Sequence, residues 1–399
     1  MSFGEAYLAA GLRSPIGRFG GALAPLRATE VASQVAAALF DRTAQSPAVA
    51  ERVIAGMVLQ DMTESNPARI VAQRVGVPDE VPAFTVNMQC CSSMVALILA
   101  AQQVALGEVD CVLTLGLESM SNAPHMVPGA RWGLRLAHGE FIDTLKECTL
   151  AGSRMWGDAH DMIDVAENHA DVDDVSRGEM DDYAVLSHGR ALTAMDAGRF
   201  DDEIVPIAVP GRDQNAILVE RDEHPRPDID RAALSRLPPV RPGGRITAGN
   251  AAGINDGAAA ALVCNAAGLA RLGLPPLARI LLPGTAMVGC DPGLMGYSCV
   301  TALDSALGAA ETRLDDIDLI ECNEGFAVQL LACARKAGWP TERLNVDGAA
   351  VGLGHPVGMS GLRIAIHLAR ALEQRDLRLG AATIPAGSGL GTAVLLQRV

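Results

Sequence analysis

Residues 89–121 read QCCSSMVALILAAQQVALGEVDCVLTLGLESMS, and residues 354–389 read GHPVGMSGLRIAIHLARALEQRDLRLGAATIPAGSG. In each stretch a turn of small residues leads into a long helical pattern and then into an apolar strand. The two copies lie roughly 270 residues apart, far above the period of a solenoid, so they indicate a duplicated half. If the halves pack about a pseudo-two-fold axis, both turns open helices that face each other and create a positive, amide-rich centre.

The composition limits the fold class. The chain has 399 residues, of which 49% are hydrophobic and only 3% aromatic. This length exceeds the usual size of one domain and predicts two domains, or one domain built twice. Alternating helix and strand patterns, separated by Gly and Pro, indicate α/β layers. We expect helices to pack closely on sheets through Ala, Val, Leu and Ile.

Charge and cysteine usage exclude several classes of protein. The net charge of −15 argues against a nucleic-acid surface, which needs clustered Lys and Arg. The nine cysteines form an odd set without metal-type CxxC spacing, so we expect free thiols, no metal site and a reducing cytoplasm. No apolar signal segment follows Met1. The longest apolar stretch, near Met94–Ala101, is far shorter than the roughly 18 residues of a membrane span.

The middle of the chain departs from the α/β pattern. Polar helices and turn-rich stretches fill it, and Ser176 with Glu179 form a capping-box signature before a helix. Its acidic run is interpreted as a solvated face. We predict an N-terminal half formed by residues 1–120 and 243–269, a loop domain over 121–242, and a C-terminal half over 270–399.

Cys90 is the candidate nucleophile. Small residues follow it before the apolar helical run, so Cys90 is expected at a helix N-terminus, where the pKa of its thiol would fall below about 8.5. The alternative is an inert thiol, since free cysteines are commonly buried. Cys91 points elsewhere and is interpreted as packing.

Three further positions are candidates for the same site. His355, held in a turn rich in Gly and Pro, could take the proton of a thiol or polarise a carbonyl, or it could be structural. Asn323 follows a buried strand and could donate to an oxyanion, or cap the strand end. The spacing around Gly387 does not match GxGxxG, which excludes nucleotide binding, but its backbone amide is a candidate for an oxyanion hole.

Five motifs, in order along nearly the whole chain, resemble those of the thiolase family. They are RSPIGRFGGALAPLRATE (13–30), VNMQCCSS (86–93), GNAAGINDGAAA (249–260), NEGFA (323–327) and GHPVGMSG (354–361). The resemblance implies a five-layered αβαβα fold, two similar halves with a loop domain, and a homodimer or homotetramer.

The resemblance also implies roles for the candidate residues. Cys90 would take an acyl group from an acyl thioester, and His355 would activate its thiol. His355 and Asn323, the latter through a water, would form one oxyanion hole, and the amides of Cys90 and Gly387 a second. The partner would be acyl-CoA or an acyl-carrier protein, with no separate cofactor. The substrate pocket would include Met162, Met295, Phe326 and Ala252.

The sequence departs from the family pattern at three places. Pro385 stands where the family's CxG motif supplies a second cysteine for proton transfer at carbon, and proline has no titratable group. Ala252 replaces a usual serine, and Asp161, preceded by His160, stands where a pantetheine-side histidine is common. Cys299 is a hypothetical replacement acid/base, with ordinary packing as the alternative.

Several functions therefore remain open. The leading hypothesis is an acyltransferase that forms acyl-Cys90 without the usual second cysteine. An authentic acetyl-CoA C-acyltransferase would need a substitute base from His355, Cys299 or water. Decarboxylative condensation, as in ketoacyl synthases, would need only Cys90, His355 and Asn323. The last alternative is a non-catalytic subunit that binds thioesters.

Overall fold

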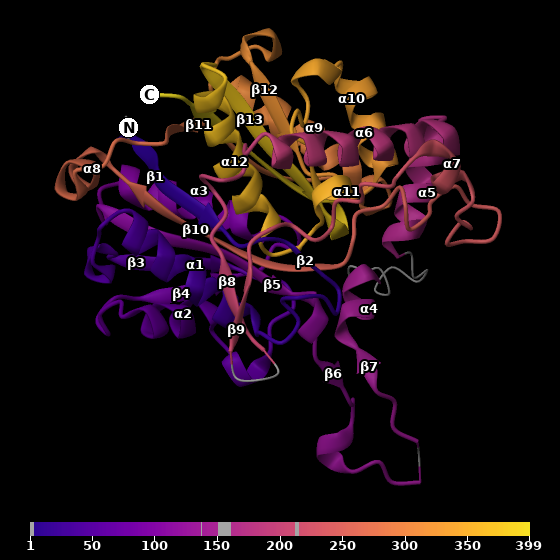
Figure 1. Ribbon diagram of the computed structural model, residues 1–399, viewed down its shortest axis with the longest axis horizontal. Helices are drawn as coiled ribbons and strands as arrows, with labels where there is room; N and C mark the ends of the chain where they lie inside the picture. Colours follow the sequence, from indigo (N-terminus) through magenta and orange to yellow (C-terminus); the bar gives the residue numbers. More distant parts are fainter. Residues whose placement is uncertain (1–3, 137, 151–160, 212–214) are drawn as a thin grey trace.

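The computed structural model describes residues 4–136, 138–150, 161–211 and 215–399. The N-terminal part of the chain (indigo) and the C-terminal part (orange to yellow) form two packed α/β bodies, and a hairpin-like arm projects from them (Figure 1). Both chain ends lie on the same side of the molecule. No helix in these described ranges is long and apolar enough to cross a bilayer.

The first half is built on a mixed sheet whose strands follow the order β1-β10-β5-β3-β4. β10, which follows the middle segment in sequence, inserts antiparallel between β1 and β5, while β3 runs parallel to both β5 and β4. β10 is buried at all ten positions, as expected for a strand covered on both faces. The bounds are β1 (Ala6–Arg13), β3 (Arg52–Gly56), β4 (Ala83–Val86), β5 (Cys111–Ser119) and β10 (Asn255–Cys264), with the short β2 (Gly17–Arg18) on β10.

The second half repeats this plan with the order β12-β13-β14-β11. β12 and β13 are parallel, and the other pairs are antiparallel. β11 also pairs with β1, from Ala6↔Ile280 to Leu8↔Ala278, so the two halves share one continuous sheet path. The bounds are β11 (Ala278–Gly289), β12 (Leu319–Cys322), β13 (Leu379–Ala386) and β14 (Leu390–Gln397).

Helices cover both faces of each half and give the predicted five layers. One apolar core lies between the sheets around α3 and α12, a second lies under α1 and α2, and a third lies under α9 and α10. The duplication is also confirmed, because α12 begins about 270 residues after α3. The bounds are α1 (Ala28–Arg42), α2 (Pro67–Val75), α3 (Ser92–Ala105), α9 (Ser298–Ala309), α10 (Ala327–Ala337) and α12 (Ser360–Gln374).

α3 and α12 form the middle layer and meet at their N-terminal ends, as the sequence predicted (Figure 1). Ser93 Oγ accepts a hydrogen bond from Leu362 N at 2.9 Å. A Cβ added to Gly361 would lie 2.6 Å from Met94 N, and one added to Gly56 would lie 2.3 Å from Ser93 N. Glycine is needed at both positions because a side chain would separate the helices from each other or from the sheet.

The middle segment carries an arm and a group of helices. Ser176 accepts from Glu179 N and Glu179 returns the bond, which confirms the predicted capping box at the start of α6. A fully buried Arg13 of β1 pairs with Glu203 and Asp222 at 2.7 Å each and fastens this segment to the first half. The elements are β6 (His125–Met126), β7 (Ile142–Asp143), α4 (Thr144–Leu150), α5 (Met162–Val172), α6 (Arg177–Asp196), β8 (Ile207–Pro210), β9 (Ala216–Val219) and α7 (Arg231–Ser235); α8 (Ala266–Leu272) and α11 (Ala350–Leu353) follow.

The close contact between α3 and α12 predicts that a methyl group added at Gly361 lowers the stability of the fold. Gly361→Ala should lower the free energy of unfolding by about 1–3 kcal/mol, because the added Cβ overpacks against the backbone of Met94. Gly189→Ala is the matched control, since Gly189 lies within α6 with no atom within 4 Å of the added Cβ, and this change should stabilise by up to about 1 kcal/mol. Chemical denaturation measures both, and equal stability of the two variants would contradict the tight contact.

Candidate active site

Cys90 lies in a tight turn between β4 and α3. It precedes Cys91, the N-cap of α3, and follows Gln89, whose φ of 52° is rare for a residue other than glycine. Ser92 holds this turn, since its Oγ accepts from Met88 N at 2.9 Å and donates to Gln89 O at 2.6 Å. Backbone in a sparsely populated conformation is typical of functional sites, where the surrounding structure maintains it.

The surroundings of Cys90 keep its thiol protonated. Burial, followed by the effect of Cys91, raises the pKa of Cys90 to about 12, although hydrogen bonds from the backbone amides of Gly387 and of Cys90 itself oppose the rise. The prediction that the helix N-terminus lowers this pKa is therefore wrong, because desolvation of the thiolate outweighs the attraction of the amides. The nucleophile consequently needs a base to remove its proton.

Cys91 has the packing role that the sequence indicated. Its side chain is fully buried, and its Sγ donates to the carbonyl of Ile384 at 3.2 Å. This contact and the amide of Gly387 beside Cys90 bring the end of β13 against the nucleophile turn at two points.

His355 is buried and oriented by two polar partners. Ser360 Oγ lies 2.7 Å from His355 Nδ1 and donates to Pro356 O, so it accepts from the protonated Nδ1. The backbone N–H of His355 donates to Asn255 Oδ1 at 2.9 Å. Burial, with a smaller effect of Arg363, lowers the pKa of His355 to about 3. The imidazole is therefore neutral at physiological pH, and its unprotonated Nε2 can act as a base.

Asn323 lies next to His355, as the sequence analysis predicted. Its Nδ2 is 3.4 Å from His355 Nε2, and its backbone N–H donates to Thr383 O. The neighbouring Glu324 has a structural position instead: its carboxylate accepts from Tyr183 and Ser187 of α6 at 2.6 and 2.8 Å. The NEGF turn thus places an amide beside the imidazole and fastens a middle-segment helix to the second half.

Pro385 lies near the end of β13. It stands between Ile384, whose carbonyl contacts Cys91, and Gly387, whose amide contacts Cys90. The parallel pairing with β12 ends at Cys322↔Thr383, so the missing N–H of Pro385 does not interrupt that ladder. Pro385 is opposite Gly391 of β14. Pro385, two residues before Gly387, therefore offers no side-chain acid or base at this end of β13.

The four predicted pocket residues come from four segments of the chain. Ala251 and Phe326 form an isolated β-bridge, and Ala252 N donates to Gly325 O at 3.0 Å, which joins the GNAAG and NEGF motifs. Phe326 and Met162 belong to one apolar cluster. Met295, buried in the short helix Pro292–Tyr297, lies in an element that packs on α5, which begins at Met162.

Asp161 caps α5 rather than presenting a free side chain. Its carboxylate accepts from Ile163 N and Asp164 N and pairs with Lys146 and Arg241. His160 lies outside the described residues.

Cys299 lies in the third core and not beside the nucleophile. Its Sγ donates to Gly296 O at 3.1 Å and lies 3.6 Å from Cys333 Sγ and 3.7 Å from Cys322 Sγ. Burial raises the pKa of this thiol well above its ordinary value. None of these contacts supports the hypothesis that Cys299 serves as an acid or base at Cys90.

The sequence analysis did not identify three residues that make hydrogen bonds around the site. Ser360 and Asn255 orient His355, and both lie inside quoted motifs, so their position in those motifs was the available signal. Glu118 is buried and accepts from the amides of Val58, Leu59 and Gly358 at 3.0–3.1 Å. Burial raises the pKa of Glu118 to about 7. Nothing in its local sequence indicated that role.

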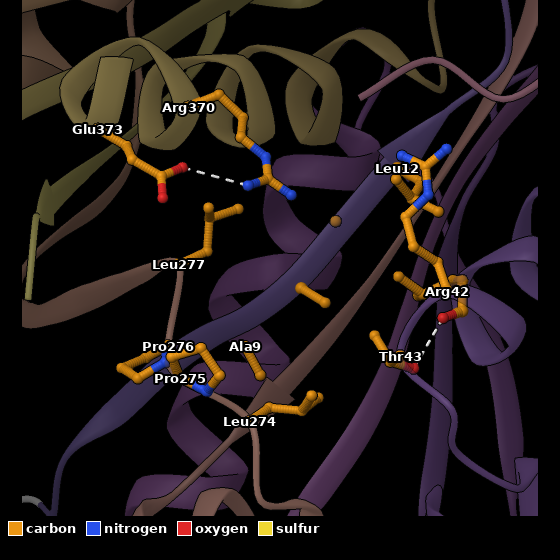
Figure 2. A pocket seen from close by; sticks show the side chains of 13 residues that line it. Ala9, Leu12, Arg42, Thr43, Leu274, Pro275, Pro276, Leu277, Arg370 and Glu373 are labelled. Atoms are coloured by element: carbon orange, nitrogen blue, oxygen red, sulfur yellow. Dashed lines mark hydrogen bonds and ion pairs between the residues drawn. The ribbon is translucent and has the colours of Figure 1, made fainter. Parts of the chain in front are cut away.

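A separate cavity of about 250 Å³ lies over β1 and contains none of Cys90, His355 and Asn323 (Figure 2). Its floor is apolar, and Arg42 and Arg370 extend above it. Arg42 belongs to the last turn of α1, where a cation offsets the helix dipole, and Arg370 pairs with Glu373 at 3.2 Å. Arg42 also donates to the carbonyl of Asp202 at 3.0 Å, so both side chains already contact groups of the protein.

Comparison with known proteins identifies the family. The thiolase N-terminal domain matches residues 6–267, and the thiolase C-terminal domain matches residues 274–398. The chain belongs to the thiolase family. The protein is therefore a thiolase-family acyltransferase.

Curated relatives cover this thiolase from end to end. The acetyl-CoA acetyltransferase of Pseudomonas aeruginosa is 41% identical over 99% of both chains, and the probable acetyl-CoA acetyltransferase of Escherichia coli is 42% identical over 97% of both. The crystal structure of the Bacillus anthracis acetyl-CoA acetyltransferase matches with a TM-score of 0.95 and 38% identity over all of both chains. Human mitochondrial 3-ketoacyl-CoA thiolase in complex with CoA matches with a TM-score of 0.94 and 37% identity, over 99% of this chain and 98% of that one.

The buried thiol of Cys90 predicts a pH dependence for its alkylation. Only the thiolate reacts with iodoacetamide, so the rate at Cys90 in the free enzyme should rise about tenfold per pH unit from about pH 7 to 10, without a plateau. Peptide mapping separates Cys90 from the other thiols, and glutathione, which levels near a pKa of about 8.5, is the reference. A rate that levels off below about pH 8 would show that the thiolate already forms in the resting enzyme.

Proposed function

We propose that this thiolase transfers acyl groups from CoA thioesters through an acyl-Cys90 intermediate. Three observations support the proposal: the Gly387 amide beside Cys90, the 3.4 Å approach of Asn323 to the neutral His355, and the hydrogen bond that joins the N-terminal ends of α3 and α12. The relatives are named as acetyl-CoA acetyltransferases and a 3-ketoacyl-CoA thiolase, which supports CoA as the carrier.

The protonation states of Cys90 and His355 set the order of the proposed steps. His355 Nε2 takes the proton of Cys90, and the sulfur attacks the thioester carbonyl. The developing oxyanion accepts hydrogen bonds from the amides of Cys90 and Gly387. His355 returns the proton to the departing CoA sulfur, which leaves acyl-Cys90 and CoA. No step up to this point needs a titratable group at Pro385.

We also propose a homo-oligomer in the cytoplasm. β4 is the end strand of the sheet path and is only partly buried, so one backbone edge is open to pairing. The arm between β6 and β7 exposes Trp132 and Phe141 by 82% and 80%, which is typical of side chains covered by a partner. All nine cysteines are free thiols, in agreement with a reducing compartment. A monomeric mass in analytical ultracentrifugation would contradict the assembly.

The acyl intermediate is directly testable. Incubation with acetyl-CoA followed by rapid acid quenching should add one acetyl group to the peptide that contains Cys90, as measured by mass spectrometry. Cys90→Ala should abolish the adduct, and His355→Ala should slow its formation by about 10²–10⁴-fold because the buried thiol then lacks a positioned base.

The outcomes separate the alternatives. A wild-type enzyme without an adduct on Cys90, in protein shown to be folded, would favour the non-catalytic thioester-binding subunit. Release of CO₂ from malonyl-CoA together with the adduct would add decarboxylative condensation to the acyl transfer.

A further inference from the structure

The proposed acyl transfer leaves one chemical task unassigned. Making or breaking a carbon–carbon bond next to a thioester requires a proton donor and acceptor at the α-carbon. Pro385 supplies none, and the Cys299 thiol lies in the third core against Cys322 and Cys333. A replacement must come from another element that reaches Cys90.

One thiol fits this requirement by position. Cys148 of α4 is half-buried and packs against the same small apolar cluster as Cys90. The cluster consists of Leu59, Met120, Leu145 and Val357. Val357 follows His355 by two residues, so the cluster links the histidine turn, the nucleophile and α4. A middle-segment helix thereby brings a second sulfur to the site.

The electrostatic surroundings of Cys148 agree with this position. The pKa of Cys148 is raised to about 12, first by burial and then by negative charge at Cys90 and at Glu118. Glu118 also raises the pKa of Cys90, so the same buried carboxylate acts on both sulfurs. Burial, together with the neighbouring Cys90 and Glu118, therefore favours the protonated form of the Cys148 thiol. A protonated thiol is the state that a proton donor to carbon requires.

We propose that Cys148 is the acid/base that protonates and deprotonates the α-carbon of the CoA thioester, in place of the group missing at Pro385. This assignment rests on the proposed acyl transfer through Cys90, and it makes the enzyme competent for thiolytic cleavage of 3-ketoacyl-CoA.

The steps balance with the groups present. Cys90 gives its proton to His355 and attacks the 3-keto carbon, the C2–C3 bond breaks, and the enolate of acetyl-CoA takes the proton of Cys148. Acetyl-CoA leaves, with acyl-Cys90 and the Cys148 thiolate remaining. An incoming CoA thiol gives its proton to Cys148 and attacks the acyl group, and Cys90 recovers its proton from His355. Neither an oxidant nor a reductant is consumed.

The other thiols do not share this position. Cys111 and Cys264 are fully buried in the second core, and Cys91 donates to the carbonyl of Ile384. Cys290 is half-buried like Cys148, but its Sγ contacts the carbonyl of Asp291 at 3.5 Å. Cys290→Ala is therefore the matched control for removal of a half-buried thiol.

The experiment compares wild-type enzyme, Cys148→Ala and Cys290→Ala in two assays. The first is CoA-dependent cleavage of acetoacetyl-CoA, together with the exchange of solvent deuterium into the methyl group of acetyl-CoA. The second is the yield and rate of the acetyl adduct on Cys90. Circular dichroism and thermal unfolding establish that each variant is folded.

We expect Cys148→Ala to lose cleavage and deuterium exchange by about 10²–10⁴-fold while its Cys90 adduct forms within about threefold of the wild-type rate, and Cys290→Ala to match wild type in both assays. Cleavage by Cys148→Ala within about threefold of wild type would overturn the assignment. So would a wild-type enzyme that forms the adduct but neither cleaves nor exchanges. Absence of the adduct in wild type would instead remove the proposed acyl transfer itself.

Discussion

The rest of the structure depends on the contact between the N-terminal ends of α3 and α12. These helices come from opposite halves of the chain, and each begins next to a catalytic candidate, Cys90 before α3 and His355 before α12. Their approach is possible because Gly361 presents no side chain to Met94. Once the two helix ends meet, the nucleophile turn, the histidine turn and the end of β13 have little freedom to separate.

The same contact sets the electrostatics of the site. Close packing removes water from both turns, which destabilises the thiolate of Cys90 and the imidazolium of His355. The two shifts act in opposite directions on their pKa values but favour one pair of states, a neutral thiol beside a neutral imidazole. Neither Cys90 nor His355 is therefore charged in the resting enzyme. Charge develops only when the acyl donor is bound, where the amides of Cys90 and Gly387 can stabilise it.

Much of this arrangement was predictable from residue order. The repeated turn-helix-strand pattern predicted the duplicated halves. Pseudo-two-fold packing of those halves predicted that the turns bearing Cys90 and His355 open helices that meet, and α3 and α12 do meet at their N-terminal ends. The pKa of Cys90 was wrongly predicted, since burial depends on contacts from distant segments that no local pattern reports. Ser360, Asn255, Glu118 and the neighbourhood of Cys148 were missed for the same reason. The effect of Pro385 on the chemistry stays a prediction.

The place of β10 has a consequence for how the chain is synthesised. β10 lies between β1 and β5 but leaves the ribosome only after the whole middle segment. Until then, β5 has one unpaired edge and β1 has two, because the other neighbour of β1 is β11, which follows β10 in the chain. Unpaired edges are prone to intermolecular pairing. The buried ion pairs of Arg13 with Glu203 and Asp222 join the middle segment to β1 in the folded chain, and all three residues are synthesised before β10. The order of the sequence thus leaves the first sheet incomplete for more than half of translation.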